Sequence, residues 1–267
     1  MPIIGSNAGS TASLFVRNNN ESLDNSIRRL SSGSRLANPL ADAAGVAVSG
    51  KLDAAIQRLS ASNDGARNII SFSQTSDGFL GTAQGQLTRL SELAQRATDG
   101  TLSDDARTAL NTEFTAIRDQ IGQTLQNASF NGTSLFQNGE ISTAINDQGD
   151  TDSIQTQELN NTTLGIQSLS LDDAASALGA ISTLDNALST VTSERARVNA
   201  DISRFQFHAN NIDNQKINVE SANSRIKDLN IAEESTNFAR DSILLRASVA
   251  MVSQSNAANA SVLGLLK

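Results

Sequence analysis

The sequence predicts a mainly α protein built from long, coiled-coil-like helices, with a few short strands near the middle of the chain. Prolines occur only at Pro2 and Pro39 of the 267 residues, so most of the chain contains no helix breaker of this kind. The aromatic residues are nine phenylalanines, without tryptophan or tyrosine, which argues against a large globular core rich in rings. Long helices with narrow apolar seams fit this composition better.

The first half of the chain contains three predicted helices. Apolar residues at helical spacing run from Ala12 to Leu30, and three asparagines at 18–20 interrupt this stripe. Asn38-Pro39 then marks a break, because the residue before a proline disfavours helix. A second helix is predicted for about 41–97, where apolar residues keep a seven-residue spacing, and a third for about 104–128.

The segment 129–170 differs from the helical regions on both sides of it. The runs 140–145 and 153–159 have the length of short strands. Turn-forming pairs recur around them, namely Asn131-Gly132, Asn138-Gly139 and Gln148-Gly149. This pattern is typical of hairpins, and we expect the part 137–170 to be exposed, turn-rich and poor in apolar anchors.

The fourth predicted helix has the most regular pattern in the chain. From Leu184 to Ile226 its seam positions alternate steps of four and three over six heptads, without glycine or proline, which predicts a coiled-coil or long-bundle helix. A last apolar stripe runs from Phe238 to Leu266. The stripes at the two ends have too little apolar surface to be stable alone, so both ends require partners. Several seam positions of the second and fourth helices are polar: Asn63, Ser73, Asp77, Arg195, Lys216 and Asn223.

Composition argues against several classes of function. The chain has 20 basic and 28 acidic residues and a net charge of −8, which disfavours general nucleic-acid binding because that needs a basic field. No apolar run approaches the length of a membrane span, so no membrane insertion is expected. The absence of cysteine excludes disulfides and thiolate metal sites. The first 16 residues lack the basic and apolar regions of a secretory signal peptide.

The sequence contains few features that would indicate a catalytic site. His208 is the only histidine, and we interpret it as a partly exposed helical residue because no second ligand or nucleophile accompanies it. Acidic pairs at 104–105, 172–173 and 233–234 open predicted helices, where they complement the helix dipole. No glycine-rich phosphate loop, G-x-S-x-G motif or EF-hand loop occurs. We therefore expect no enzyme activity, and no catalytic, cofactor or metal site.

Two groups of short motifs closely resemble the terminal signatures of bacterial flagellins. Those toward the N-terminus are Arg29–Leu36 with Asp42–Gly45, Asn63–Gly65, Gln74–Gly78 and Phe130–Leu135. Those toward the C-terminus are Ser224–Asn230, Glu233–Arg240 and the apolar tail Ser261–Leu266. The resemblance covers about 1–136 and 172–267. Because only about 40 residues separate the two halves, the chain resembles a short flagellin that lacks large variable outer domains.

The resemblance implies a hairpin arrangement in which the N- and C-terminal helices pair. The expected domains are an inner filament core of 1–38 with 233–267, an outer bundle of long helices from 39–129 with 171–232, and a short β-hairpin surface region at 130–170. It also implies a function, because many copies of a flagellin polymerise helically into the extracellular filament used for swimming. Export would follow the flagellar type III route, as an unfolded chain without a cleaved signal peptide.

The resemblance further implies the partners of the chain and the residues that contact them. The partners are other copies of the chain, the flagellar export apparatus, an export chaperone at the C-terminal helix, the filament cap and hook-associated proteins. The residues expected to pack subunits together are Leu23, Ile27, Leu30, Phe238, Leu245, Val249, Val252, Leu263 and Leu266.

Flagellins of many bacteria are sensed by an animal Toll-like receptor through their outer helices. The matching positions here are Leu87, Arg89, Leu93 and Glu113. A structural role is the alternative, because Leu87 lies on the seam and an Arg89–Glu113 ion pair across helices would account for both charges. Ser91 and Arg96 also depart from the residues expected in strongly recognised flagellins.

Three other functions are compatible with parts of the sequence. A hook–filament junction protein shares the terminal signatures, although the C-terminal match is close to that of a filament protein. A cytosolic coiled-coil scaffold would explain the heptads but not the paired signatures. An enzyme site within 137–170 is the third alternative.

Overall fold

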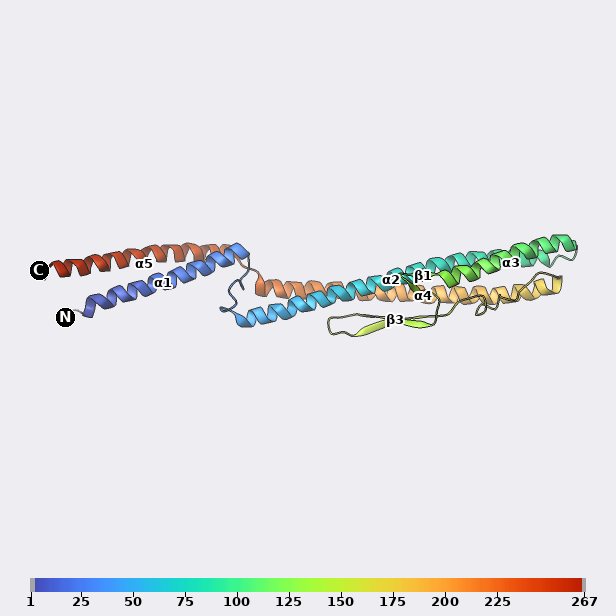
Figure 1. The fold of residues 1–267 in the computed structure, drawn as a ribbon, viewed down its shortest axis with the longest axis horizontal. Coiled ribbons are helices and arrows are strands. Elements are labelled where there is room, and N and C mark those ends of the chain that lie inside the picture. Colours follow the sequence, from blue (N-terminus) through green and yellow to red (C-terminus); the bar gives the residue numbers. More distant parts are fainter. Residues whose placement is uncertain (1–2, 266–267) are drawn as a thin grey trace. The chain divides into compact units, whose positions relative to one another are not determined.

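The computed structural model describes residues 3–265, and the side chains of residues 10–258, 260 and 261. Its elements are α1 (Ile3–Ser32), α2 (Ala43–Ala97), α3 (Asp104–Asn127), β1 (Ser129–Phe130), β2 (Thr133–Ser134), β3 (Gly139–Ala144), β4 (Thr151–Thr156), α4 (Ala174–Lys227) and α5 (Ile231–Leu265) (Figure 1). The mainly α fold with paired ends and a small hairpin region is therefore confirmed.

The chain forms two compact units. The terminal unit comprises Met1–Ala55 and Asn218–Lys267, and the central unit comprises Ile56–Ile217. The filament domains expected from the resemblance, with boundaries near residues 38 and 233, stay a prediction.

In the terminal unit, α1 and α5 lie side by side and antiparallel (Figure 1). Helix α1 is continuous through the asparagines at 18–20, although the apolar stripe is interrupted there. Asn19 accounts for this, because its Nδ2 donates a hydrogen bond of 2.7 Å to Ser248 Oγ on α5. The asparagine thus becomes part of the contact between the helices instead of ending the first one.

The connections that follow α1 and α4 are paired with each other. Gly33 follows α1 with φ of 66°, the left-handed conformation that often terminates a helix. The backbone N–H of Arg35 donates to the carbonyl of Lys227 at 2.8 Å, and that of Leu229 donates to Gly33 at 3.1 Å. These bonds hold the adjoining ends of α1 and α5 in place.

The core of the central unit lies between α2, α3 and α4. The seams predicted for the second and fourth helices lie in this core, where large side chains are fully enclosed. Its members include Leu59, Leu80 and Leu87 of α2, Phe114, Ile121 and Leu125 of α3, and Leu184, Val191, Phe205 and Ile212 of α4. Close packing of these side chains supplies most of the stability of the unit.

Two antiparallel hairpins follow α3. In the shorter one, β1 and β2 are joined by Asn131 and Gly132, whose φ values of 48° and 81° suit a two-residue hairpin turn. In the longer one, β3 and β4 pair with Ile141 opposite Ile154. The prediction of hairpins in this segment is confirmed.

The expectation that 137–170 has few apolar anchors is wrong. Polar contacts also attach the segment to the helices: Arg58 Nε donates to the carbonyl of Asp147 at 2.7 Å, and Arg204 Nη2 donates to that of Ser153 at 2.8 Å. The apolar anchors were missed because they occur singly in short stretches between turns, so the overall composition of the segment does not reveal them. The anchors are each at most 4% exposed and comprise Ile154, Leu159, Leu164 and Ile166.

Gly65 of α2 marks a close approach of β3 to the helix. A Cβ atom at this position would collide with Oγ1 of Thr143 and lie 3.3 Å from its Cβ. Gly65→Ala is therefore expected to displace β3 and to lower the free energy of unfolding by about 1–3 kcal/mol. Thermal unfolding followed by circular dichroism measures this, and adding Thr143→Ala should recover part of the loss.

Gly78 provides the matched control on the same helix. No atom lies within 4 Å of the position of its Cβ, so Gly78→Ala should stabilise the protein by about 0.5–1 kcal/mol. Equal effects of the two alanine substitutions would contradict the close contact at Gly65.

Candidate assembly interface

The α1–α5 pair buries no large apolar side chain among those that the structure describes. The buried residues of the two helices are small or polar, namely Ala12, Ser26, Glu234 and Ser248. This differs from the central unit, which encloses phenylalanine, leucine and isoleucine. The large apolar side chains of α1 and α5 therefore stay partly or largely in water.

Of the residues predicted to pack subunits together, some are exposed in the structure and others are half-buried. Ile27 and Val249 are exposed, by 47% and 53%. The side chain of Leu263, and the whole of Leu266, lie outside the described residues. Their roles in subunit packing stay predictions. The half-buried members are Leu23, Leu30, Phe238, Leu245 and Val252.

Helix α5 carries apolar side chains around its circumference. Phe238, Leu245 and Val252 recur every seven residues on the half-buried side. Sequence reasoning missed the other faces, because a heptad pattern selects one stripe only. A helix that is apolar on all sides is typical of one that is covered on all sides. The exposed apolar residues lie at the start of the half-buried stripe (Ile231), on one flank (Val249), on the other flank (Leu244 and Met251) and on the outer face (Ile243).

Helix α1 has a different surface. Arg17, Glu21, Asp24 and Arg28 are all exposed, and their spacing of four, three and four residues places them on one face. This face is mainly charged and suited to water, although it also contains Leu14, which is 53% exposed.

A groove of about 300 Å³ lies between α1 and α5. Phe15 of α1 and Met251 of α5 provide its large apolar side chains, and each is more than half exposed. The remaining lining is small or polar, from Thr11, Ala12, Gln254 and Ser255. The pair thus leaves space that an additional side chain could fill.

Glu234 is the buried acidic residue of α5. It is 5% exposed, and its Oε1 lies 3.8 Å from Nη1 of Arg29 on α1. This ion pair attaches the start of α5 to the last turn of α1, beside the paired connections that follow α1 and α4.

A polar contact between Asp77 of α2 and Arg195 of α4 crosses the seam of the central unit. Arg195 Nε donates to Asp77 Oδ1 at 2.9 Å, and Nη2 donates to Oδ2 at 3.2 Å. This hydrogen bonding, together with the Arg195 charge and a hydrogen bond from Asn199, lowers the pKa of Asp77 below its ordinary value of 3.8, although desolvation opposes the change.

The lowered pKa predicts a loss of stability in acid. The unfolded chain, with the ordinary pKa of 3.8, takes up the proton first, so the contribution of the pair is present above this pH and disappears as the pH falls toward the folded-state pKa. As the pH falls through 3.8 and below, the unfolding free energy should fall more steeply for the natural protein than for Asp77→Asn. Denaturant titrations at each pH test this, and parallel curves would refute it.

The residues matched to the receptor contact are placed differently from one another. Leu87 and Leu93 are fully buried in the core. Arg89 Nη2 donates to Glu113 Oε1 at 2.7 Å, and Arg89 Nη1 donates to Glu92 Oε2 at 3.0 Å. The ion pair between the helices is therefore present, and only the charged residues offer side-chain surface to a partner. Receptor contact stays a prediction.

His208 attaches the longer hairpin to α4. It is partly exposed, as expected, and its Nε2 lies 3.0 Å from Oδ2 of Asp152 on β4. Arg204 Nη1 donates to the other carboxylate oxygen at 2.8 Å. The sequence did not indicate this partner, because 56 residues separate His208 from Asp152.

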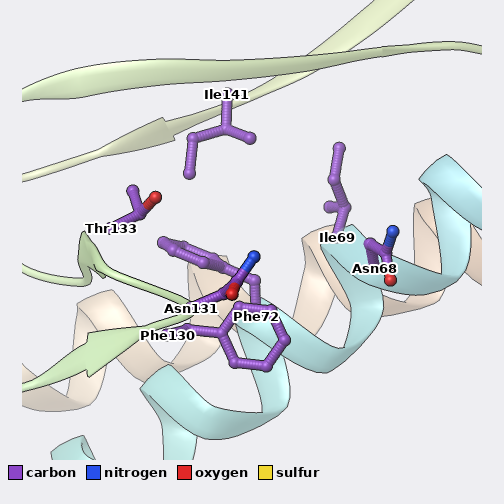
Figure 2. A pocket seen from close by; sticks show the side chains of 7 residues that line it. All are labelled: Asn68, Ile69, Phe72, Phe130, Asn131, Thr133 and Ile141. Carbon is purple, nitrogen blue, oxygen red and sulfur yellow. The ribbon is translucent and has the colours of Figure 1, made fainter.

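An apolar groove of about 550 Å³ lies between α2 and the two hairpins. Figure 2 shows its lining side chains, which come from α2, from β1–β2 and from β3. The rings of Phe72 and Phe130 meet edge to face, with centroids 6.1 Å apart. The lining contains no carboxylate, imidazole or amine, so it offers no acid or base for catalysis. Its other members are Asn68, Ile69, Asn131, Thr133 and Ile141.

Across the part of the chain that the structure describes, no helix has the length and apolar character needed to cross a membrane. In the same part, no three potential metal ligands from histidine, cysteine, aspartate or glutamate come together.

Comparison with known proteins matches both halves of the chain. Residues 6–140 match the bacterial flagellin N-terminal helical region, and residues 181–266 match the bacterial flagellin C-terminal helical region. The flagellar filament 30.7 kDa core protein of Treponema maltophilum is 31% identical over 266 residues, which cover 93% of each chain. This relative is of similar length, as expected for a short form.

Solved structures agree with these matches. A flagellin from Bacillus cereus aligns with a TM-score of 0.52 and 26% identity, over 56% of this chain and 88% of that one. A putative flagellar hook-associated protein from Vibrio parahaemolyticus aligns with a TM-score of 0.56 over 70% of this chain and 98% of that one, but at 12% identity, which supports the fold alone. With both terminal regions matched and the helix pair in place, the chain belongs to the bacterial flagellin family, as a short member.

Proposed function

We propose that this chain is a structural subunit of an extracellular flagellar filament, and that neighbouring subunits cover the exposed apolar surface of its helix α5. The family match and the name of the Treponema relative support the filament role. The surface of α5 supports the assignment of the interface.

The observation that carries the proposal is the apolar surface of α5. Five large apolar residues of this helix are between 45% and 66% exposed. Covering them would contribute roughly 4–8 kcal/mol per subunit, from about 1.5–3 kcal/mol for each fully buried side chain. The α1–α5 pair cannot provide this cover, so copies of the same chain are the partners that a homopolymer supplies.

The remaining partners follow from the same surface. An export chaperone at α5 would cover its apolar faces before assembly. The filament cap and hook-associated proteins would contact the subunits at the two ends of the polymer, where one neighbour is missing. Export as an unfolded chain through the flagellar type III route completes the proposal.

Charged substitutions on the two flanks of α5 test the interface. Leu244→Asp and Val249→Asp, made separately, should each raise the critical concentration for polymerisation at least about tenfold, because a carboxylate would be buried between subunits. Sedimentation and electron microscopy of purified protein measure this. Asn18→Asp adds the same charge to exposed α1 surface and should polymerise normally.

Circular dichroism must show the same helical content for all three variants. Normal filaments from both flank variants would refute this interface. Electron microscopy also separates the alternatives, because a filament subunit gives long helical polymers, a junction protein gives short caps and a scaffold gives discrete bundles.

A further inference from the structure

Two polar contacts cross the α2–α4 seam of the central unit at related positions. One joins Asp77 to Arg195, and the other joins Asn63 to the backbone carbonyl of Ala209 at 3.1 Å. The two contacts are fourteen residues apart on each helix, in opposite directions along the chain. They therefore belong to one antiparallel register and are separated by two heptads.

We call each of these contacts, with the polar side chains around it, a polar layer. In the first layer, which contains Asp77 and Arg195, the hydrogen-bonding groups are extensively paired. Besides its two bonds to Asp77, Arg195 donates from Nη1 to Gln84 Oε1 at 2.6 Å. Asn199 Nδ2 donates to Asp77 Oδ1 at 3.1 Å. Each charged group of the layer has a partner on the opposite helix, so this layer is satisfied only when these particular residues face each other.

The second layer has the same character. Asn63 is 6% exposed and is held by two acceptors on α4, because its Nδ2 also donates to Asp213 Oδ1 at 3.0 Å. Arg67 Nε in turn donates to Asn63 Oδ1. A buried amide of this kind is costly to leave without partners.

The sequence continues this spacing for another fourteen residues, to Ser49 and Asn223. Within the terminal unit, Ser49 Oγ donates to Asn223 Oδ1 at 2.8 Å, and Asn223 Nδ2 donates to Asp53 Oδ1 at 2.7 Å. Both Ser49 and Asn223 are buried. Four of the polar seam positions found in the sequence, Asn63, Asp77, Arg195 and Asn223, thus take part in contacts between α2 and α4.

We propose that the two polar layers of the central unit set the register of the α2–α4 pair in that unit and exclude pairings that are shifted by one heptad. Apolar seam residues alone cannot distinguish such pairings, because they recur every seven residues. A shift of seven would place Asp77 opposite Ile202 or Leu188, depending on its direction. The carboxylate would then be buried against a side chain that cannot bind it.

Packing of the β3–β4 hairpin is the competing explanation for the register. Arg58 and Arg204 attach the hairpin to α2 and α4, and these contacts would also resist a shift. The two explanations predict different results. If the polar layers set the register, removing them should allow a shift, and if the hairpin sets it, removing the hairpin contacts should allow a shift.

Disulfide trapping in the full chain tests the proposal, since the natural sequence contains no cysteine. Ile70→Cys with Ile202→Cys reports the observed register, and Ile70→Cys with Ala209→Cys reports a shift of one heptad. Each pair is placed in three backgrounds. These are the natural sequence, a layer-free variant (Asn63→Leu, Asp77→Leu, Arg195→Leu) and a hairpin-released variant that removes the polar contacts of the hairpin with α2 and α4 (Arg58→Ala, Ser62→Ala, Arg204→Ala, His208→Ala). Gel mobility after mild oxidation measures the fraction of each cysteine pair that forms a disulfide. The ratio of the fraction for the first pair (the native disulfide) to that for the second pair (the shifted disulfide) is then compared between backgrounds.

In the natural and hairpin-released backgrounds, we expect the native disulfide only. In the layer-free background the ratio should fall at least about tenfold, while the unfolding temperature stays the same or rises, because leucines replace a partly buried ion pair. A layer with a merely stabilising role would lower the unfolding temperature and leave the ratio unchanged. Native disulfide alone in the layer-free background, or shifted disulfide in the hairpin-released one, would overturn the proposal.

A charge-swapped variant keeps the test decisive if the layer-free variant does not fold. Asp77→Arg with Arg195→Asp preserves an ion pair in the first layer and leaves the second layer intact. It should give the native disulfide only. Shifted disulfide in this background would also overturn the proposal.

Discussion

Deletion of residues 233–267 is expected to abolish filament formation and to leave the central unit folded. The deletion removes nearly all of α5, and with it the apolar faces assigned to subunit contacts. Helix α1 then loses its partner and should unfold, because an isolated helix with little apolar surface is marginal in water. The core between α2, α3 and α4 is untouched, so the melting temperature of the monomer should change little.

Circular dichroism and sedimentation of the truncated protein measure this result. The helical signal should fall by no more than α1 and the deleted residues contribute, and no polymer should sediment. Filaments formed by the truncated protein would show that the interface lies elsewhere. A loss of helix well beyond α1 and α5 would show that the central unit depends on them.

Truncating the side chain of Phe205 should strongly destabilise the central unit. This ring lies on the seam of α4 and is fully buried. Phe205→Ala should lower the free energy of unfolding by about 3–5 kcal/mol, through lost burial and the cavity that remains. Denaturant unfolding of the monomer measures the change.

Phe207 is the matched control, two residues further along the same helix. Its side chain is 63% exposed, so Phe207→Ala should change stability by less than about 0.5 kcal/mol. Similar effects at both positions would mean that the seam of α4 has been placed on the wrong face. The pair of variants therefore tests the helix orientation with the side-chain chemistry held constant.

Much of the helical framework could be predicted from the sequence, because periodicity is a local property. The predicted range 41–97 corresponds to α2 at Ala43–Ala97, and the regular steps from Leu184 to Ile226 fall within α4. The break at Asn38-Pro39 and the hairpin segment were also predicted from neighbouring residues. The same local reasoning failed where a residue depends on a distant partner, as Asn19 does on Ser248.

The candidate interface was predicted only in part. Heptad spacing selected Phe238, Leu245 and Val252, which are half-buried in the α1–α5 pair. It could not select Leu244 or Met251, because these lie off the stripe, and it missed Ile231, which lies seven residues before Phe238 and is exposed. Whether such residues matter depends on how much of the helix its own chain leaves uncovered, and that is known only after the pair has formed.

The sequence by itself determined which segments are helical, which positions form seams and which of those positions are polar. Only the tertiary structure decided that Asp77 meets Arg195, 118 residues away, and that Gly65 lies against Thr143. The physical reason is that a repeating seam allows several registers of nearly equal apolar burial. Choosing among them depends on contacts between residues far apart in the chain, which no local pattern encodes.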